Sequence, residues 1–150
     1  MSAYRTVVVG TDGSETAALA VRHAAHLAKA FGGELVVVTA FSPQPTLDRE
    51  VEASIPDELL WTVTDSAKAE DHARAASVIA KEVGLDKVRV RSEKGDPADA
   101  LVNAAEDTGA DLIVVGSRGM TSASRFLLGS VPNKVSHHAP CDVMIVHTVA

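Results

Sequence analysis

The stretch that decides the fold is residues 6–14, TVVVGTDGS, in which three valines are followed by glycines and short polar residues. A valine run without polar alternation is typical of a strand buried on both faces, as in a parallel sheet with helices on each side. The glycines and polar residues after it are typical of a tight turn into a helix. Similar apolar runs occur at residues 35–38, 112–115 and 143–146. The sequence therefore predicts four buried parallel strands.

Four helical patterns lie between and around these runs, with apolar residues recurring every three to four positions. They cover residues 17–31, about 57–83, 98–105 and about 130–138. Pro97 precedes the third pattern in a position that is favoured in the first turn of a helix. A fifth strand is predicted at residues 87–91, KVRVR, where valines alternate with charges. Such alternation is typical of a strand with one wet face near the edge of a sheet.

Strict alternation of strand and helix predicts an α/β fold, an open parallel sheet of five strands with helices on both faces. The 150 residues fit a single domain spanning 1–150. With 46% hydrophobic residues, the chain has enough apolar material for an ordinary packed core.

The composition argues against several classes of partner. There are 14 Lys and Arg against 20 Asp and Glu, a net charge of -6, which is the wrong sign for a broad nucleic-acid surface. Aromatic residues are only 3%, so stacking platforms for single strands are not expected. No apolar run approaches the roughly 18 residues of a membrane span, and we expect no membrane partner. The lone Cys141 and the lack of a signal-peptide core favour a cytoplasmic location.

Two glycine-containing loops follow predicted strands and are the candidate ligand site. In open parallel sheets, ligands bind beyond the carboxyl ends of the strands. GTDGS at residues 10–14 and GSRG at 116–119 allow backbone N–H groups to approach a ligand closely. The second loop continues as Gly116-x2-Gly119-x9-Gly129-Ser130 into a helix, with Ser130 placed as a helix cap. This spacing predicts a phosphate cradle, although neither the Walker motif nor the dinucleotide-binding fingerprint is present.

Together with the closing segment SHHAPCDVMIV at residues 136–146, these motifs resemble the universal stress protein family, in its nucleotide-binding, ATP-type branch. The resemblance covers essentially the whole chain. It implies a Rossmann-like fold with strand order 3-2-1-4-5 and an adenine nucleotide, ATP or cyclic AMP, held between the first and fourth strands. It also implies a homodimer formed by pairing of the last strands, Val143 to Val146. An apolar strand at a sheet edge independently favours such a partner, which would cover it.

The resemblance also implies roles for individual residues. Asp12 would accept a hydrogen bond from a ribose hydroxyl or approach a metal, and Ala40 would offer backbone groups to the adenine edge. Mg²⁺ or Mn²⁺ would arrive with the nucleotide rather than in a protein cage. The full set of implied nucleotide-binding residues is Gly10, Thr11, Asp12, Gly13, Ser14, Ala40, Gly116, Arg118, Gly119, Gly129, Ser130 and Val131.

Structural alternatives stay open for several of these residues. Asp12 could cap the first helix with Glu15 three residues later, the glycines could serve only tight turns, and Arg118 could be a solvated charge. His23 and His26 lack a third ligand nearby and are predicted to be surface residues. Cys141 is predicted to be a small apolar packing residue rather than a reactive thiol.

The function is therefore predicted as nucleotide binding in a stress response, as a sensor or reservoir. No catalytic residue is predicted, because no nucleophile elbow, C-x-x-C motif or nucleotidyl-transfer signature is present. Two alternatives stay open: slow ATP hydrolysis or adenylyl transfer, and a dimer that binds no nucleotide and acts through protein contacts.

Overall fold

The computed structural model describes residues 4–41, 65–117 and 130–148, and within them five parallel strands form one sheet in the order β3-β2-β1-β4-β5. The elements in chain order are β1 (Thr6–Gly10), α1 (Glu15–Ala30), β2 (Glu34–Phe41), α4 (Asp65–Val83), β3 (Val88–Lys94), α5 (Pro97–Thr108), β4 (Leu112–Gly116), α6 (Ser130–His138) and β5 (Asp142–Val146). The predicted fold class and strand order are confirmed. Residues 57–64 of the second predicted helix lie outside the described residues.

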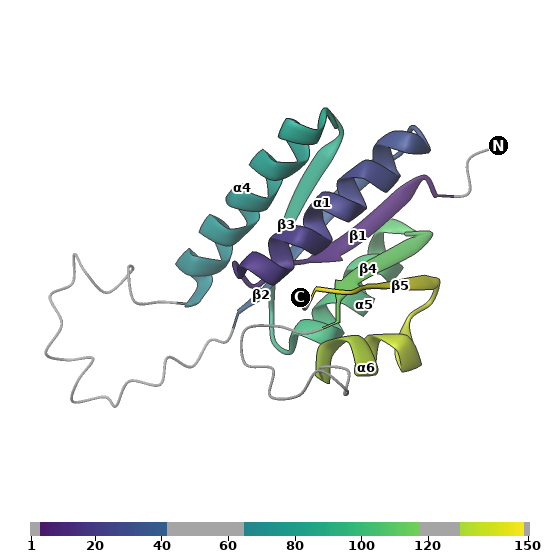
Figure 1. The fold of residues 1–150 in the computed structure, drawn as a ribbon. Helices are drawn as coiled ribbons and strands as arrows, with labels where there is room; N and C mark the ends of the chain where they lie inside the picture. Colours follow the sequence, from purple (N-terminus) through teal and green to yellow (C-terminus); the bar gives the residue numbers. More distant parts are fainter. Residues whose placement is uncertain (1–3, 42–64, 118–129, 149–150) are drawn as a thin grey trace, which may run out of the picture.

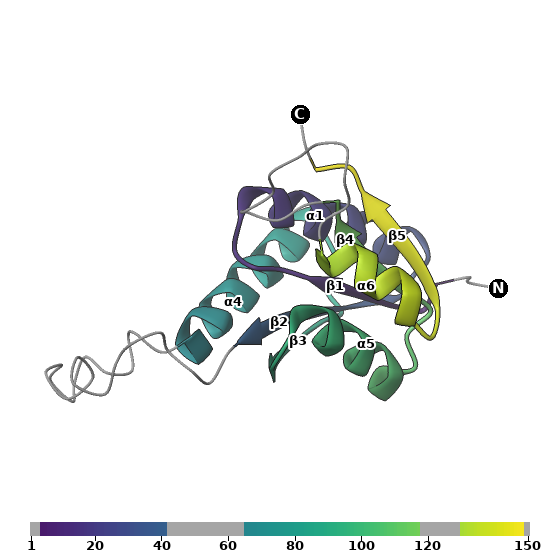
Figure 2. The same cartoon turned by 90° about the horizontal axis from the view of Figure 1, so that it is seen from below.

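The helices form a layer on each face of the sheet, α1 and α4 on one side and α5 and α6 on the other (Figures 1 and 2). Successive strand residues point into opposite layers. In β1, Val7 and Val9 pack in the cluster with α1 and α4, whereas Val8 packs in the cluster with α5 and α6. The same alternation separates Leu35 from Val36 in β2. Burial on both faces is the reason that these strands are apolar without interruption.

The two edge strands differ in character. β3 pairs with β2 from Leu35 opposite Val88 to Phe41 opposite Lys94, so it begins one residue later and ends three residues later than predicted. Its edge position is confirmed, but its burial is not a simple alternation of buried valines and wet charges. Val90 is 48% exposed, whereas Arg91 is half-buried and forms ion pairs with Glu93 and Asp107 of α5.

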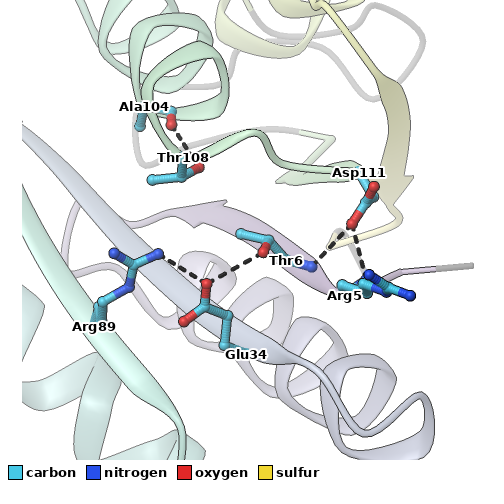
Figure 3. A network of polar contacts seen from close by, with 7 residues as sticks. All are labelled: Arg5, Thr6, Glu34, Arg89, Ala104, Thr108 and Asp111. Carbon is cyan, nitrogen blue, oxygen red and sulfur yellow. Dashed lines mark hydrogen bonds and ion pairs between the residues drawn. The ribbon is translucent and has the colours of Figure 1, made fainter. Parts of the chain in front are cut away.

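A polar network ties the strands together at their amino ends (Figure 3). Asp111 Oδ2 accepts hydrogen bonds from the backbone N–H groups of Arg5 at 2.9 Å and Thr6 at 3.1 Å. Glu34 Oε1 in turn accepts from Thr6 Oγ1 at 3.2 Å and from Arg89 at 2.8 Å. The network therefore joins β1 to β2 and β3, and to the residue just before β4.

Replacing Asp111 with alanine should destabilise the fold by about 1–3 kcal/mol, because two backbone N–H groups lose their acceptor. Asp111→Asn retains one acceptor oxygen and should cost less. Urea unfolding of both variants measures the difference, with Asp86→Ala at an exposed position as the control. Equal stabilities for Asp111→Ala and Asp111→Asn would show that the acceptor does not matter.

None of the helices in the described ranges has the length and apolar character required to cross a membrane.

Candidate functional site

A cavity of about 170 Å³ opens at the carboxyl ends of β1, β2 and β4. This is the edge where the sheet order reverses between β1 and β4, so the cavity has the location expected for a ligand in an open parallel sheet. Its lining residues are Gly10, Thr11, Asp12, Ser14, Ala17, Val38, Ala40, Pro97, Leu101, Val115, Gly116, Val131 and Pro132.

The turn after β1 supplies the polar end of the cavity. Thr11 N donates to Val38 O at 3.0 Å, which fixes the start of the turn against β2. Gly13 N donates to Thr11 Oγ1 at 3.1 Å, and Ser14 N donates to Asp12 Oδ1 at 2.9 Å. Gly13 has a φ of +82°, which favours glycine. The turn is thus held by its own side chains, and Asp12 is exposed at the cavity.

The N-cap of α1 is Ser14, whose Oγ accepts from Ala17 N at 3.1 Å. The alternative that Asp12 caps this helix is therefore wrong, because the helix begins at Glu15 and Asp12 bonds to the N-cap residue itself. Only one Asp12 oxygen is engaged in that bond, and a carboxylate can accept several more hydrogen bonds. The N-terminus of α1 adds partial positive charge at this end of the cavity.

Much of the remaining cavity lining is apolar. This apolar wall consists of Val38 and Ala40 from β2, Pro97 and Leu101 from α5, and Val115 from β4. Gly10 lies against this wall, and a Cβ at its position would come within 3.1 Å of Leu101 Cδ2 and 3.2 Å of Cδ1. The close approach of β1 to α5 therefore accounts for glycine at the end of the first strand.

Helix α6 closes a third side through Val131 and Pro132. An ion-pair cluster joins this helix to α5, in which Lys134 Nζ lies 3.2 Å from Asp96 Oδ2 and 3.1 Å from Asp99 Oδ1. Asp96 is also the N-cap of α5 and accepts from Asp99 N. Burial raises the pKa of Asp96, but the Asp99 N–H group and Lys134 outweigh it and lower the pKa overall. The ionised cluster thus holds two walls of the cavity together.

The cavity brings together seven of the predicted residues: Gly10, Thr11, Asp12, Ser14, Ala40, Gly116 and Val131. Gly13 belongs to the same turn but does not line the cavity. Ser130 does not line it either and is the first described residue of α6; because residue 129 lies outside the described ranges, the predicted role of Ser130 as the helix cap stays a prediction. Arg118, Gly119 and Gly129 lie outside the described residues.

The prediction missed the α5 wall, Pro97 and Leu101, together with Ala17, Val38, Val115 and Pro132. Ala17, Val38, Val115 and Pro132 lie within three positions of predicted site residues, whereas Pro97 and Leu101 do not. An apolar residue in a cavity wall has the same sequence signature as one in the core, however, and periodicity does not separate the two.

Side chains that could bind metal or react as nucleophiles are sparse. Across the described ranges, no group of three or more His, Cys, Asp or Glu side chains could hold a metal ion. His23 and His26 are exposed, as predicted. Cys141 is half-buried against the cluster beneath α5 and α6. Burial raises the pKa of its thiol, and the carboxylates of Asp142 and Asp111 raise it further, which disfavours the reactive thiolate.

Comparisons with known proteins agree with this fold. A family model described as the universal stress protein family matches residues 3–147. A universal stress protein of Mycobacterium tuberculosis is 43% identical over 148 residues, covering 99% of both chains. A crystal structure of a universal stress protein in complex with cAMP is 37% identical, with a TM-score of 0.74 over 99% of this chain and 100% of the other.

A universal stress protein from Archaeoglobus fulgidus in complex with dAMP is 26% identical, with a TM-score of 0.68 over 95% of this chain and 97% of the other. The match of the family model to nearly every residue, the similarity to the mycobacterial relative and the shared fold agree with one another. On this evidence the chain belongs to the universal stress protein family.

Proposed function

We propose that this protein binds an adenine nucleotide in the cavity beyond β1, β2 and β4, and acts in stress adaptation as a nucleotide sensor or reservoir in the cytoplasm. The observation that carries the proposal is that this cavity has both polar and apolar lining residues. Its lining combines a polar turn at a helix N-terminus with apolar residues of β2, α5 and β4, which suits a ligand that has both a ribose phosphate and a flat base. Two similar proteins of the family were crystallised with cAMP and dAMP, which supports the choice of adenine.

In this arrangement the base lies against Ala40 of β2 and Pro97 and Leu101 of α5. The exposed carboxylate of Asp12 accepts a hydrogen bond from a ribose hydroxyl. The cavity of about 170 Å³ is smaller than the roughly 300 Å³ at which ligand pockets usually begin. We infer that the phosphates extend beyond it, past Gly116 and Val131.

A divalent cation, Mg²⁺ or Mn²⁺, is proposed to accompany the polyphosphate. The chain can offer Asp12 as a carboxylate ligand, which is a hard oxygen donor of the kind these ions prefer. The remaining ligands would be phosphate oxygens and water. When bound, the cation supplies charge neutralisation for the phosphates.

Calorimetric titration with ATP and with cAMP, each with and without Mg²⁺, tests the proposal. GTP serves as the control for base recognition. We expect heat from at least one adenine nucleotide, with one site per chain and a much weaker signal from GTP. Absence of heat with both adenine nucleotides would contradict nucleotide binding and favour the alternative of a protein that acts through protein contacts alone.

The same protein is proposed to form a homodimer through the free edge of β5. β5 pairs with β4 on one side, and no other described strand covers its second edge. Val143 and Met144 are half-buried and Ile145 is 37% exposed, so the edge carries apolar side chains that a partner strand would cover.

Light scattering at micromolar concentration should therefore give twice the mass of one chain. Ile145→Lys should shift the mass toward the monomer, because it places charge in the proposed interface. Val90→Lys, at an exposed valine on the opposite edge strand β3, is the matched control and should leave the dimer intact. A monomeric mass for the unaltered chain would contradict the proposal.

A further inference from the structure

The imidazole of His72 lies against the turn that forms the polar end of the cavity. His72 belongs to α4, about sixty residues away in sequence from Gly13 of the turn. The tip of its ring, atoms Cδ2, Nε2 and Cε1, occupies the space that a Cβ on Gly13 would need. The φ of +82° at Gly13 favours glycine, and a side chain at this position would also displace the His72 ring.

The contact lies at one end of the seam between two neighbouring helices. α1 and α4 run side by side on the same face of the sheet (Figure 1). Further along α4, Ile79 and Val83 follow His72 at spacings of seven and four, which places all three on one side of the helix. Both pack against the core cluster beneath α1. At the far end of the seam, Lys29 Nζ donates to Val83 O at 3.2 Å.

His72 contacts the turn without lining the cavity. Thr11, Asp12 and Ser14 line the cavity, whereas Gly13 and His72 do not. Residues of α5 and α6, which cover the opposite face of the sheet from α4 (Figure 2), line part of the cavity, and Ala17 of α1 also lines it. A nucleotide in the cavity would therefore meet Thr11, Asp12 and Ser14, whereas the imidazole contacts the turn at Gly13.

We propose that His72 is a positioning residue for nucleotide binding, and that its ring packs against Gly13 and holds the Asp12–Ser14 turn in its binding conformation. The inference rests on the proposed function, since its consequence is nucleotide affinity. The turn has left-handed backbone at Gly13, and the side-chain bonds that the described residues give to its Gly13 and Ser14 amides are both short-range, from Gly13 N to Thr11 Oγ1 and from Ser14 N to Asp12 Oδ1. Without the ring, the turn gains freedom that nucleotide binding must then remove, and affinity falls.

The first test compares His72→Ala with His72→Phe by calorimetric titration with ATP and cAMP. We expect His72→Ala to weaken binding by about threefold to tenfold, the cost of ordering one additional group. His72→Phe retains a planar ring of similar size and should recover most of the affinity. Ile79→Ala, two turns along the same seam, is the control for a general structural effect and should lower the melting temperature while leaving affinity unchanged.

The second test measures the turn directly and uses no nucleotide. Hydrogen exchange of the Gly13 and Ser14 amides, followed by NMR, should be faster in His72→Ala than in the unaltered protein and near the original rate in His72→Phe. The amides of α5 serve as the internal reference, and their exchange rates should be the same in all three proteins.

The outcomes separate this inference from the proposed function. If the unaltered protein binds no nucleotide, the proposed function fails, and faster exchange in the turn still supports the packing role of His72. If the unaltered protein binds but His72→Ala binds within twofold of it, the inference is wrong. It is also wrong if amide exchange in the turn is unchanged in His72→Ala, or if His72→Phe loses as much affinity as His72→Ala.

Discussion

Alanine in place of Asp12 is expected to weaken binding of ATP or cAMP by about tenfold to one hundredfold. A hydrogen bond to a charged group contributes about 1.5–3 kcal/mol, and each 1.4 kcal/mol corresponds to about tenfold in affinity. Asp12 is exposed at the cavity, and only its Oδ1 atom is used within the turn, by Ser14 N. Calorimetric titration of the variant measures the loss.

Two further variants separate the effect of charge from that of hydrogen bonding and provide a control. Asp12→Asn retains one acceptor oxygen without the charge and should lie between Asp12→Ala and the unaltered protein. Asp86→Ala removes an exposed carboxylate just before β3, at the amino end of the sheet, and should leave affinity unchanged. If the affinity of Asp12→Ala is within twofold of that of the unaltered protein, Asp12 does not bind the nucleotide.

Leu35→Ala should lower the free energy of unfolding by about 2–5 kcal/mol, the range for removing a buried leucine side chain. Leu35 is fully buried in β2, where it pairs with Val7 of β1 and Val88 of β3. Truncation leaves a cavity between the sheet and the helices α1 and α4, because the neighbouring strands cannot close around the missing atoms. Equilibrium unfolding in urea measures the change.

Leu19→Ala is the matched control, because Leu19 of α1 is 45% exposed and alanine suits a helix. It should change the free energy of unfolding by less than about 0.5 kcal/mol. If Leu35→Ala and Leu19→Ala lower the free energy of unfolding by similar amounts, the sheet does not bury Leu35 as described.

The buried strands could be predicted because burial on both faces leaves a simple signature. Val7, Val8 and Val9 are all fully buried, and nothing polar interrupts them. The end of β3 had no such signature. Ser92 to Lys94 is polar, and it is extended because its backbone pairs with Thr39 to Phe41 of β2, a long-range contact that local sequence does not encode. The strand order likewise came from the family resemblance, since alternation alone does not specify which strands are neighbours.

The same difference between local sequence signals and long-range contacts applies to the candidate site. The turn from Gly10 to Ser14 could be predicted, because glycine and short polar residues after a buried strand indicate a tight turn from the local sequence alone. Leu101 could not be distinguished from a core residue, because its role depends on where α5 crosses the ends of β1 and β2. His72 had no local signal, because its contact with Gly13 exists only once α4 packs beside α1.

The central claim is that the nucleotide binds in the cavity bounded by the turn after β1, Ala40 and Gly116, rather than on a basic surface. Amide chemical shifts recorded by NMR during titration with ATP and with cAMP test it most directly. We predict saturable shifts at residues 10–14 and at Gly116, with little change at the amino ends of the strands around Thr6 and Glu34. Saturating nucleotide that leaves the amides of residues 10–14 unmoved, or shifts only residues far from the cavity, would contradict the account.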